Sequence, residues 1–384
     1  IRCQTPHSIA MATPLLSINT KEHCFEAQFH PSRSLLACAT ITGEVEVHNF
    51  DLENRTEELL KTISGHKRSC RAAKFLSDSI LASTGADKFA LLSDLETEKQ
   101  VWQCKLKAAG YCLLPLDAER FAIGDDDGGL RIFEGRQPKA AVSWSENSDF
   151  IADLTMGTDG TSLCAASGDG TLAVYDIRKS GEKGLIAMSD FQEDELLAIV
   201  VLRRGTKVIC GSQTGVLPIF SWGDFGDQKD RIKGHPMSVD AMVKIAEDGI
   251  ITGSSDGKLR VVSVHSKSLG NNILGILGEQ DSTEYPIERL SLSPDGEHMA
   301  STSHGKPSVQ LWSTEAARRL LNGESWKSIF EVEAVEASAD AEVDSSEEEQ
   351  PKKKRRKEKK KGKKAVPGGG NQKQQQAAKF FSGL

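Results

Sequence analysis

Histidine and aspartate recur at one fixed spacing in two separate parts of the chain. A Gly-His pair stands at Gly65-His66 and again at Gly234-His235, and an aspartate follows each histidine after 21 residues, at Asp87 and Asp256. A buried carboxylate needs a hydrogen-bond partner, and an imidazole can supply one. Because the spacing is repeated, we interpret both pairs as structural parts of a recurring unit.

Other residues whose side chains could take part in catalysis or metal binding do not form a catalytic site. Asp125, Asp126 and Asp127 are consecutive and could bind a cation, but their setting between glycines favours a tight turn. The sequence has no phosphate-binding loop, nucleophile elbow or paired-histidine metal motif. Its eight cysteines lack metal-ligand spacing and read as buried thiols of a reducing compartment. We therefore expect no enzymatic activity, no metal and no cofactor.

One eleven-residue phrase recurs along the chain and must position these residues. It reads GDDDGGLRIFE at 124–134, ASGDGTLAVYD at 166–176 and GSSDGKLRVVS at 253–263. Its penultimate position recurs seven times at intervals of 40 to 50 residues, at His48, Ser93, Phe133, Tyr175, Phe220, Val262 and Trp312. Between these positions, alternating apolar residues are bounded by turn residues, which is a strand signal. The period is that of a four-stranded propeller blade. The sequence thus predicts an all-β protein with seven blades in a ring.

The phrase and the two Gly-His pairs resemble WD repeats. In that family the histidine and the turn aspartate belong to a buried hydrogen-bond network that locks each blade. The resemblance implies the same structural role for the turn residues Asp127 and Asp169, and Trp312 keeps the tryptophan of the repeat. Other copies are degenerate, with Thr42, Thr214 and Lys306 at the turn. Blades without the network rest on apolar packing, and we expect them to be softer.

The ring needs a closure, and the segment Leu15–Asn19 is a short alternating strand. We expect it to pair as the outer strand of the blade that contains Trp312, which removes an open sheet edge. Alternatively Thr314–Leu321 folds back, although its composition favours a short helix. The expected organisation is a flexible segment at 1–14, a propeller at 15–330 and a disordered charged tail at 331–384.

The net charge of −7 hides an asymmetry. Residues 331–384 carry ten acidic and thirteen basic side chains, so residues 1–330 carry a net charge of −10. An acidic body is a poor nucleic-acid binder, and we expect it to bind proteins. No apolar run has the length of a membrane span, and neither a membrane nor a small-molecule substrate is expected.

The tail is acidic at 331–349 and basic at 351–364. Such a segment cannot bury a core, so we expect it to be disordered when free. The densest basic run of the tail favours a nuclear localisation signal that importin binds over a solvated charge run without function. We also expect this run to make non-specific contact with RNA. The run consists of Lys352, Lys353, Lys354, Arg355, Arg356 and Lys357. Ser345 and Ser346 precede acidic residues, as substrates of acidophilic kinases do.

The string Tyr175-Asp176-Ile177-Arg178 resembles the WDxR motif by which WD-repeat receptors dock on the adaptor of cullin-RING ubiquitin ligases, with Tyr in place of Trp. The resemblance implies that Tyr175, Asp176 and Arg178 form a docking site. The alternative is an ordinary strand end with an arginine that faces solvent.

Seven degenerate repeats, the YDIR string, the acidic-then-basic tail and Phe380-Phe381 near its end together resemble the WD repeat-containing protein 55 family. That family comprises nuclear and nucleolar scaffolds implicated in ribosomal RNA processing, ribosome biogenesis and cell-cycle progression. The resemblance implies a non-enzymatic scaffold with pre-ribosomal partners in the nucleus and nucleolus, and with some cytoplasmic population. Two alternatives remain: a substrate receptor of a cullin-RING ligase, and a chromatin or histone-tail reader that uses the acidic body.

Overall fold

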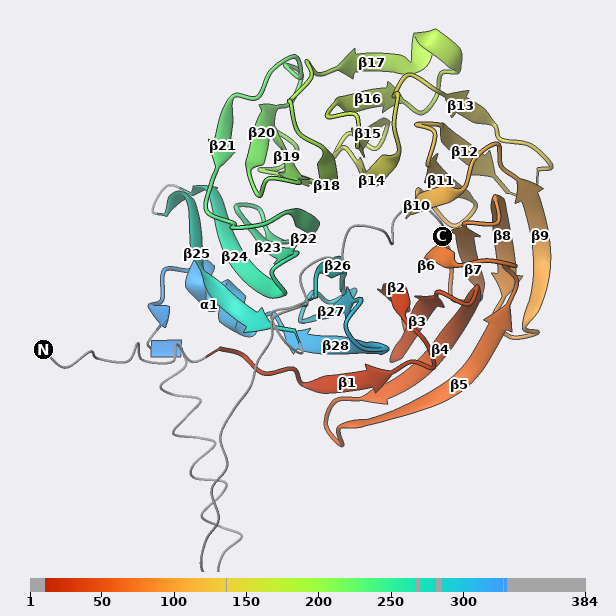
Figure 1. The fold of residues 1–384 in the computed structure, drawn as a ribbon, viewed down its shortest axis with the longest axis horizontal. Coiled ribbons are helices and arrows are strands. Elements are labelled where there is room, and N and C mark those ends of the chain that lie inside the picture. Colours follow the sequence, from red (N-terminus) through yellow and green to blue (C-terminus); the bar gives the residue numbers. More distant parts are fainter. Residues whose placement is uncertain (1–10, 136, 267–268, 281–284, 327, 330–384) are drawn as a thin grey trace, which may run out of the picture. The chain divides into compact units, whose positions relative to one another are not determined.

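The structure, a computed structural model, describes residues 11–329 except 136, 267–268, 281–284 and 327. Seven four-stranded antiparallel sheets stand around a central channel (Figure 1). The predicted seven-bladed β-propeller is confirmed. The charged tail, with its basic run and its two serines, lies outside the described residues.

The blades are numbered 1 to 7 in chain order, and in each the first strand lies innermost (Figure 1). Blade 1 comprises β2 (Cys24–Phe29), β3 (Leu35–Thr40), β4 (Glu44–Asp51) and β5 (Thr56–Ser64). Blade 2 comprises β6 (Cys70–Phe75), β7 (Ile80–Gly85), β8 (Phe89–Asp94) and β9 (Lys99–Lys105). Blade 3 comprises β10 (Gly110–Pro115), β11 (Arg120–Asp125), β12 (Leu130–Glu134) and β13 (Val142–Trp144). Blade 4 comprises β14 (Ile151–Met156), β15 (Ser162–Ser167), β16 (Leu172–Asp176) and β17 (Leu185–Met188).

The second half of the ring repeats this plan. Blade 5 comprises β18 (Leu196–Leu202), β19 (Lys207–Ser212), β20 (Leu217–Ser221) and β21 (Asp230–Ile232). Blade 6 comprises β22 (Val239–Ala246), β23 (Gly249–Ser254), β24 (Lys258–Ser266) and β25 (Gly270–Glu279). Blade 7 comprises β26 (Ile287–Leu292), β27 (His298–Ser303), β28 (Ser308–Ser313) and β1 (Leu16–Asn19). A short 3₁₀ helix (Gly181–Gly184) precedes β17, and α1 (Glu315–Leu321) follows β28. No helix in the described part of the chain is long and apolar enough to cross a membrane.

The ring closes as the sequence predicts. Strand β1 pairs with β28 in blade 7, with Leu16 opposite Leu311 and Ile18 opposite Val309. Ile18 is fully buried, so the closure adds core contacts as well as a strand. The segment after Trp312 forms the helix α1, as its composition indicates, and α1 packs its Ala317 and Leu320 into the core of blades 6 and 7.

Every innermost strand carries a β-bulge at its second residue. The pairing with the next strand shifts there by one residue in all seven blades. A bulge re-aims the side chain that it carries. The seven residues so placed are Phe25, Arg71, Tyr111, Ala152, Leu197, Asp240 and Glu288.

Apolar clusters between neighbouring blades hold the ring together. The indole of Trp312 is fully buried, and a Cβ atom at Gly278 would lie 2.5 Å from it, so only glycine fits at this interface. Seven cysteines lie among the described residues, all as thiols, and six are buried. Burial raises the pKa of thiols such as Cys112, which makes them poor nucleophiles.

Candidate functional site

Two arginines converge on one tyrosine where the innermost strands begin. Arg71 and Arg289 place their guanidinium carbons 5.7 and 5.6 Å from the centre of the Tyr111 ring, at cation–π distance. The Tyr111 ring also packs on Phe150, with 5.0 Å between the ring centres. Arg71 donates to Asp126 at 2.6 Å. We call these five residues, from blades 2, 3, 4 and 7, the mouth cluster.

The mouth cluster has the residue types of a protein-binding surface. Arginine and tyrosine combine a large contact area with fixed hydrogen-bonding groups and are enriched where interfaces gain most of their energy. Burial raises the pKa of Tyr111, and the charge of Arg289 opposes that shift. The phenol therefore stays neutral and can donate a hydrogen bond to a partner.

Arg289 also crosses the channel. Its Nη2 donates to the backbone carbonyl of Ala152 in blade 4 at 3.1 Å, although Arg289 belongs to blade 7. Burial raises the pKa of Asp153, the next residue of β14, and the charge of Arg289 opposes this rise. One side chain thus ties two distant blades together and compensates a buried acid.

The space below Arg289 is small and lined by paired charges. A cavity of about 150 Å³ is bounded by Glu26, Lys74, Asp153 and Arg289, with apolar residues between them. Lys74 pairs with Glu26 at 2.8 Å, and Asp153 accepts the backbone N–H of Ile199 at 3.1 Å. Ligand pockets usually measure about 300–1,000 Å³, so this cavity is small for a drug-sized ligand.

A second acid lies beside the mouth cluster. Burial raises the pKa of Glu288 to about 8, the neighbouring Asp240 adds to the rise and Arg289 opposes it. Glu288 contacts the imidazole of His304, whose own pKa is lowered by burial and by the nearby His23. The Glu288 carboxyl therefore changes charge near neutral pH.

The structure brings together one of the two predicted His–Asp pairs. His66 Nδ1 lies 2.8 Å from Asp87, and its Nε2 lies 2.9 Å from the hydroxyl of Ser83. Burial works to raise the pKa of Asp87, but the His66 hydrogen bond and two backbone N–H groups outweigh it, and the pKa is lowered. This chain of contacts joins the loop before β6 to the turn after β7.

The second pair does not form, although its spacing is identical. Asp256 is held by both terminal nitrogens of Arg260, four residues later. In the described part of the chain, His235 Nε2 lies 2.9 Å from the Thr252 hydroxyl, and its Nδ1 makes no hydrogen bond to Asp256. Burial and the charge of Arg260 lower the pKa of His235 to about 4. The prediction was wrong here because a bidentate guanidinium outcompetes a neutral imidazole for the carboxylate.

Asp127 is exposed, which corrects its predicted place in a buried network. Its neighbour Asp125 is fully buried instead and accepts the backbone N–H of Gly129 at 2.7 Å. Asp125 also pairs with Arg131. Asp126 accepts a hydrogen bond from Arg71, Asp125 pairs with Arg131, and Asp127 is exposed. The three carboxylates therefore do not converge on a cation site.

Asp169 and Trp312 take part in networks that use amides in place of histidine. Asp169 accepts from the Thr171 hydroxyl at 2.6 Å, and Asn147 donates to that hydroxyl at 3.0 Å. In blade 7, Trp312 donates to the Ser301 hydroxyl at 2.8 Å, and that hydroxyl donates to Gln280 at 2.6 Å.

The YDIR residues are split between core and surface. Tyr175 is fully buried, stacks on Trp144 and donates to Asn147 at 3.1 Å, so it cannot contact an adaptor. The Arg178 side chain is 64% exposed, and its Nε and Nη2 donate hydrogen bonds to the buried Asp176 carboxylate at 2.8 and 2.9 Å. These hydrogen bonds lower the pKa of Asp176, which stays ionised. Only Arg178 is thus available as a docking residue.

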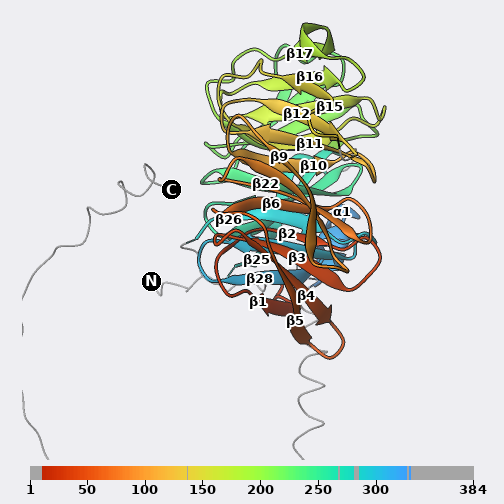
Figure 2. The ribbon, with the colours of Figure 1, turned by 90° about the vertical axis from the view of Figure 1, so that its right-hand side faces the viewer.

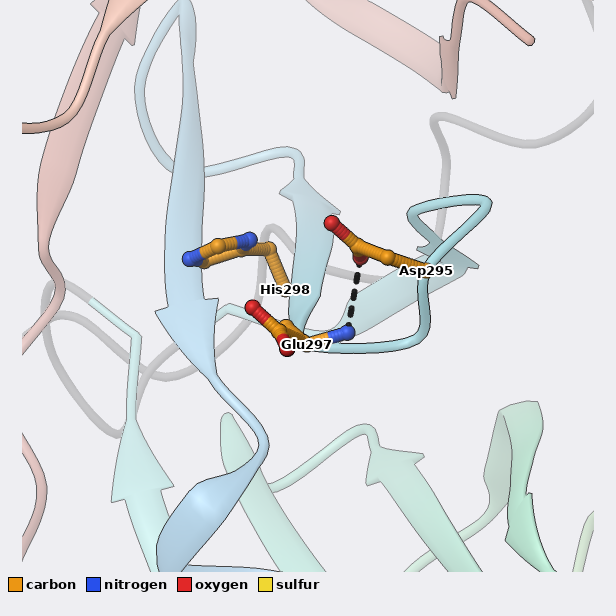
Figure 3. A group of neighbouring side chains, drawn as sticks. All are labelled: Asp295, Glu297 and His298. Atoms are coloured by element: carbon orange, nitrogen blue, oxygen red, sulfur yellow. Dashed lines mark hydrogen bonds between the residues drawn. The ribbon is translucent and has the colours of Figure 1, made fainter. Parts of the chain in front are cut away.

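Three further side chains have the composition of a metal site. Asp295 and Glu297 of the turn before β27 and His298, its first residue, each place one ligand atom within 4.8 Å of the others (Figure 3). Asp295 already accepts from the Ser293 hydroxyl at 2.5 Å and from the Glu297 backbone at 2.8 Å, and both carboxylates are exposed. This geometry is that of a capped turn, and it carries no metal assignment.

The mouth cluster could not be predicted from single repeats, because its members come from four blades. Two of them, Arg71 and Tyr111, share one signal, since both occupy the bulged second residue of the first strand of their repeat. Alignment of the seven repeats on this position would have singled out large polar side chains, but not their convergence.

The fold and these contacts define a WD-repeat propeller. The chain matches the WDR55 family over residues 16–317. WD repeat-containing protein 55 of Arabidopsis thaliana is 36% identical over 78% of this chain and 83% of its own length. Its Homo sapiens counterpart is 30% identical over 83% and 79%, and the WD repeat-containing protein JIP5 of Cryptococcus neoformans is 31% identical over 79% and 83%. The chain belongs to the WDR55 family.

Proposed function

We propose that this chain is a non-enzymatic scaffold for protein–protein interactions in the nucleus and nucleolus, where it serves ribosomal RNA processing and ribosome assembly. The observation that carries the scaffold proposal is the mouth cluster beside a small cavity lined by the chain's own charged side chains. The cavity is small for a typical ligand, whereas the arginines and the tyrosine of the mouth cluster suit a protein surface. The nucleolar role rests on the likeness to the WD repeat-containing protein 55 family.

In this proposal the charged tail directs the protein to the nucleus. Importin binds the basic run at 352–357, and the same residues make non-specific contact with RNA. Phosphorylation of Ser345 and Ser346 adds negative charge close to the run and weakens its capture by importin. No membrane, metal or small-molecule substrate takes part.

Affinity purification of the tagged chain from nuclear extract tests the scaffold proposal. We expect pre-ribosomal proteins to dominate the bound fraction and ribosomal RNA precursors to accumulate after depletion. The Arg71→Ala variant removes one member of the mouth cluster and should lose part of this fraction, whereas Lys88→Ala, an exposed charge, should not. Normal ribosomal RNA after depletion would refute the ribosomal role, and a bound fraction of histones would favour the chromatin reader.

The exposure of Arg178 favours a second candidate function, that of a substrate receptor on a cullin-RING ligase. Asp176 fixes the guanidinium in one orientation, and a rigid planar charge suits a docking interface. Substitution Arg178→Ala should abolish capture of the ligase adaptor and leave the pre-ribosomal fraction unchanged. Undiminished adaptor capture by Arg178→Ala and Arg178→His would eliminate this candidate.

A further inference from the structure

The outer strands of the seven blades differ widely in length. Strands β13 and β21 have 3 residues, β1 and β17 have 4, and β9 has 7. Two are longer: β5 has 9 residues and β25 has 10. Each outer strand is paired on one side only, and a long unpaired edge is a template for another chain.

The chain itself covers the edge of β25. The backbone N–H of Ala12 donates to the carbonyl of Leu277 at 2.8 Å, so the backbone before β1 already makes a hydrogen bond to this strand. The indole of Trp326 lies against Gly275, where a Cβ atom would be 2.9 Å away. Leu274 packs against the same apolar cluster as α1. The long outer strand of blade 6 thus receives a backbone hydrogen bond together with an apolar side chain from elsewhere in the chain.

Strand β5 has the same local structure without such a cover. Its pairing with β4 shifts by one residue at Leu60, as the pairing of β25 with β24 shifts at Leu274. Leu60 therefore occupies the position of Leu274. Leu59 and Leu60 are 37% and 45% exposed, and in Figures 1 and 2 β5 forms the outer rim of the ring. Among the described residues, none pairs with the outer edge of β5.

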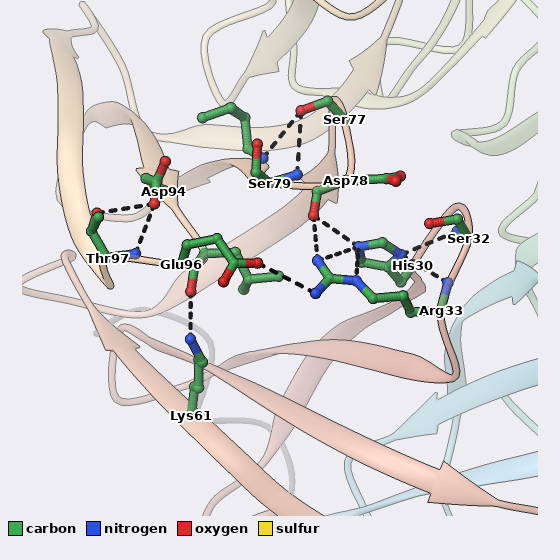
Figure 4. A network of polar contacts seen from close by, with 12 residues as sticks. His30, Ser32, Arg33, Lys61, Ser77, Asp78, Ser79, Asp94, Glu96 and Thr97 are labelled. Carbon is green, nitrogen blue, oxygen red and sulfur yellow. Dashed lines mark hydrogen bonds and ion pairs between the residues drawn. The ribbon is translucent and has the colours of Figure 1, made fainter.

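The β5 edge is also held in place before any partner arrives. Lys61 donates to the carbonyl of Leu95 in blade 2 at 2.8 Å (Figure 4), and Glu57 contacts His48 at 3.2 Å. Arg33 of blade 1 contacts His30, the carbonyl of Asp78 and Glu96 beside this junction (Figure 4). A preorganised edge loses little conformational entropy on binding, which favours affinity.

Charge indicates the chemistry of the partner. Residues 51–61, from the end of β4 through the turn into β5, carry Asp51, Glu53, Glu57 and Glu58 against the two cations Arg55 and Lys61. A basic segment complements this surface. The acidic body of a second copy does not, because residues 1–330 carry a net charge of −10 and two such bodies repel each other.

From these observations we propose that β5 binds an extended, basic segment of a partner protein by strand addition, with an aliphatic or aromatic side chain of that segment on Leu59 and Leu60. This inference rests on the proposed scaffold function and adds a surface remote from the mouth cluster. Main-chain hydrogen bonds supply affinity in such complexes, and the seated side chains supply specificity.

The test uses the full chain and a fluorescent synthetic peptide of alternating lysine and valine with one central tryptophan. A second peptide of the same sequence carries N-methyl groups on alternate amides, which removes backbone donors without changing charge. We expect the methylated peptide to bind about tenfold more weakly, and Leu60→Ser to weaken binding of the first peptide about fivefold. Hydrogen exchange should slow at residues 56–64 when the first peptide binds.

The control is Ile186→Ser, since Ile186 occupies the same bulge position in the short strand β17 and is 52% exposed. Its affinity should stay within about twofold of the unchanged chain. Equal binding of both peptides, equal loss in both variants, or no binding at millimolar peptide would overturn the proposal. A dimer that Leu60→Ser dissolves would assign the edge to a second copy instead. Loss of pre-ribosomal partners by Arg71→Ala is scored separately, so either proposal can fail alone.

Discussion

Replacement of Arg289 by methionine tests whether one side chain ties blade 7 to blade 4 across the channel. Methionine keeps most of the side-chain volume and removes the charge. The variant loses a charge-assisted hydrogen bond to the Ala152 carbonyl, worth about 1.5–3 kcal/mol, and a cation–π contact with Tyr111, worth about 0.5–2 kcal/mol. Because methionine recovers some apolar packing, we expect a net loss of about 3 kcal/mol of unfolding free energy.

The pH dependence of this loss identifies its cause. Arg289 opposes the rise in the pKa of Asp153, so the Arg289→Met variant should have a still higher Asp153 pKa. An ionised Asp153 without its counter-charge destabilises the fold, whereas a protonated one does not. The loss should therefore be larger at pH 8 than at pH 5.

Urea unfolding of both proteins, followed by tryptophan fluorescence at the two pH values, measures the effect. Thermal unfolding should show a fall of about 6 °C, at about 2 °C per kcal/mol for a domain of this size. Asp153→Asn in the variant background should restore part of the stability at pH 8. A loss below about 0.5 kcal/mol, or one that does not change with pH, would refute the tie across the channel.

Three further predictions concern stability. His66→Ala should cost about 2–3 kcal/mol because it removes the imidazole contacts to Asp87 and Ser83 and leaves the Asp87 carboxylate with backbone donors alone. His235→Ala should cost about 1 kcal/mol less, since His235 makes no hydrogen bond to Asp256; paired urea titrations compare the two variants. Deletion of residues 1–20 removes β1 and the buried Ile18 and should lower the melting temperature by about 6 °C or more, and an unchanged value would contradict the closure. Burial raises the pKa of Glu288 to about 8, so its contribution to the unfolding free energy is fully present below the ordinary value near 4.5 and is lost as the pH rises through 8. Glu288→Gln should make the unfolding free energy less dependent on pH between these limits. An unchanged dependence on pH would exclude this titration.

The fold follows from the sequence because each blade is built from local contacts. Hairpins and their turn residues repeat along the chain, so the period alone indicates seven blades, and the alternation at Leu15–Asn19 indicates the closing strand. Apart from the pairing of β1 with β28, the arrangement of the ring can be predicted without contacts between residues far apart in the sequence. That is why degenerate repeats, such as the one with Lys306 at its turn, still form blades.

Side-chain partners are less predictable because several donors compete for one acceptor. His66 and His235 have the same spacing to an aspartate, yet Arg260 decides the outcome in blade 6. Asp125 and Asp127 differ by two positions in one turn, and Arg131 selects the first. In each case the deciding residue is the arginine at the eighth position of the repeated phrase, a position that varies between copies and is Ala173 in the copy at 166–176.

The mouth cluster shows a limit of a different kind. Arg289 and its acceptor Ala152 are 137 residues apart and face each other only because seven blades close at a fixed diameter. A repeat predicts where along a strand a side chain stands, whereas the number of blades determines which strands face each other. Function in a propeller depends on the second kind of information, since partners bind surfaces that combine several blades. The β5 edge is the exception, because it lies within one blade, and its length, its bulge and its two leucines can all be found by comparing that blade with its neighbours.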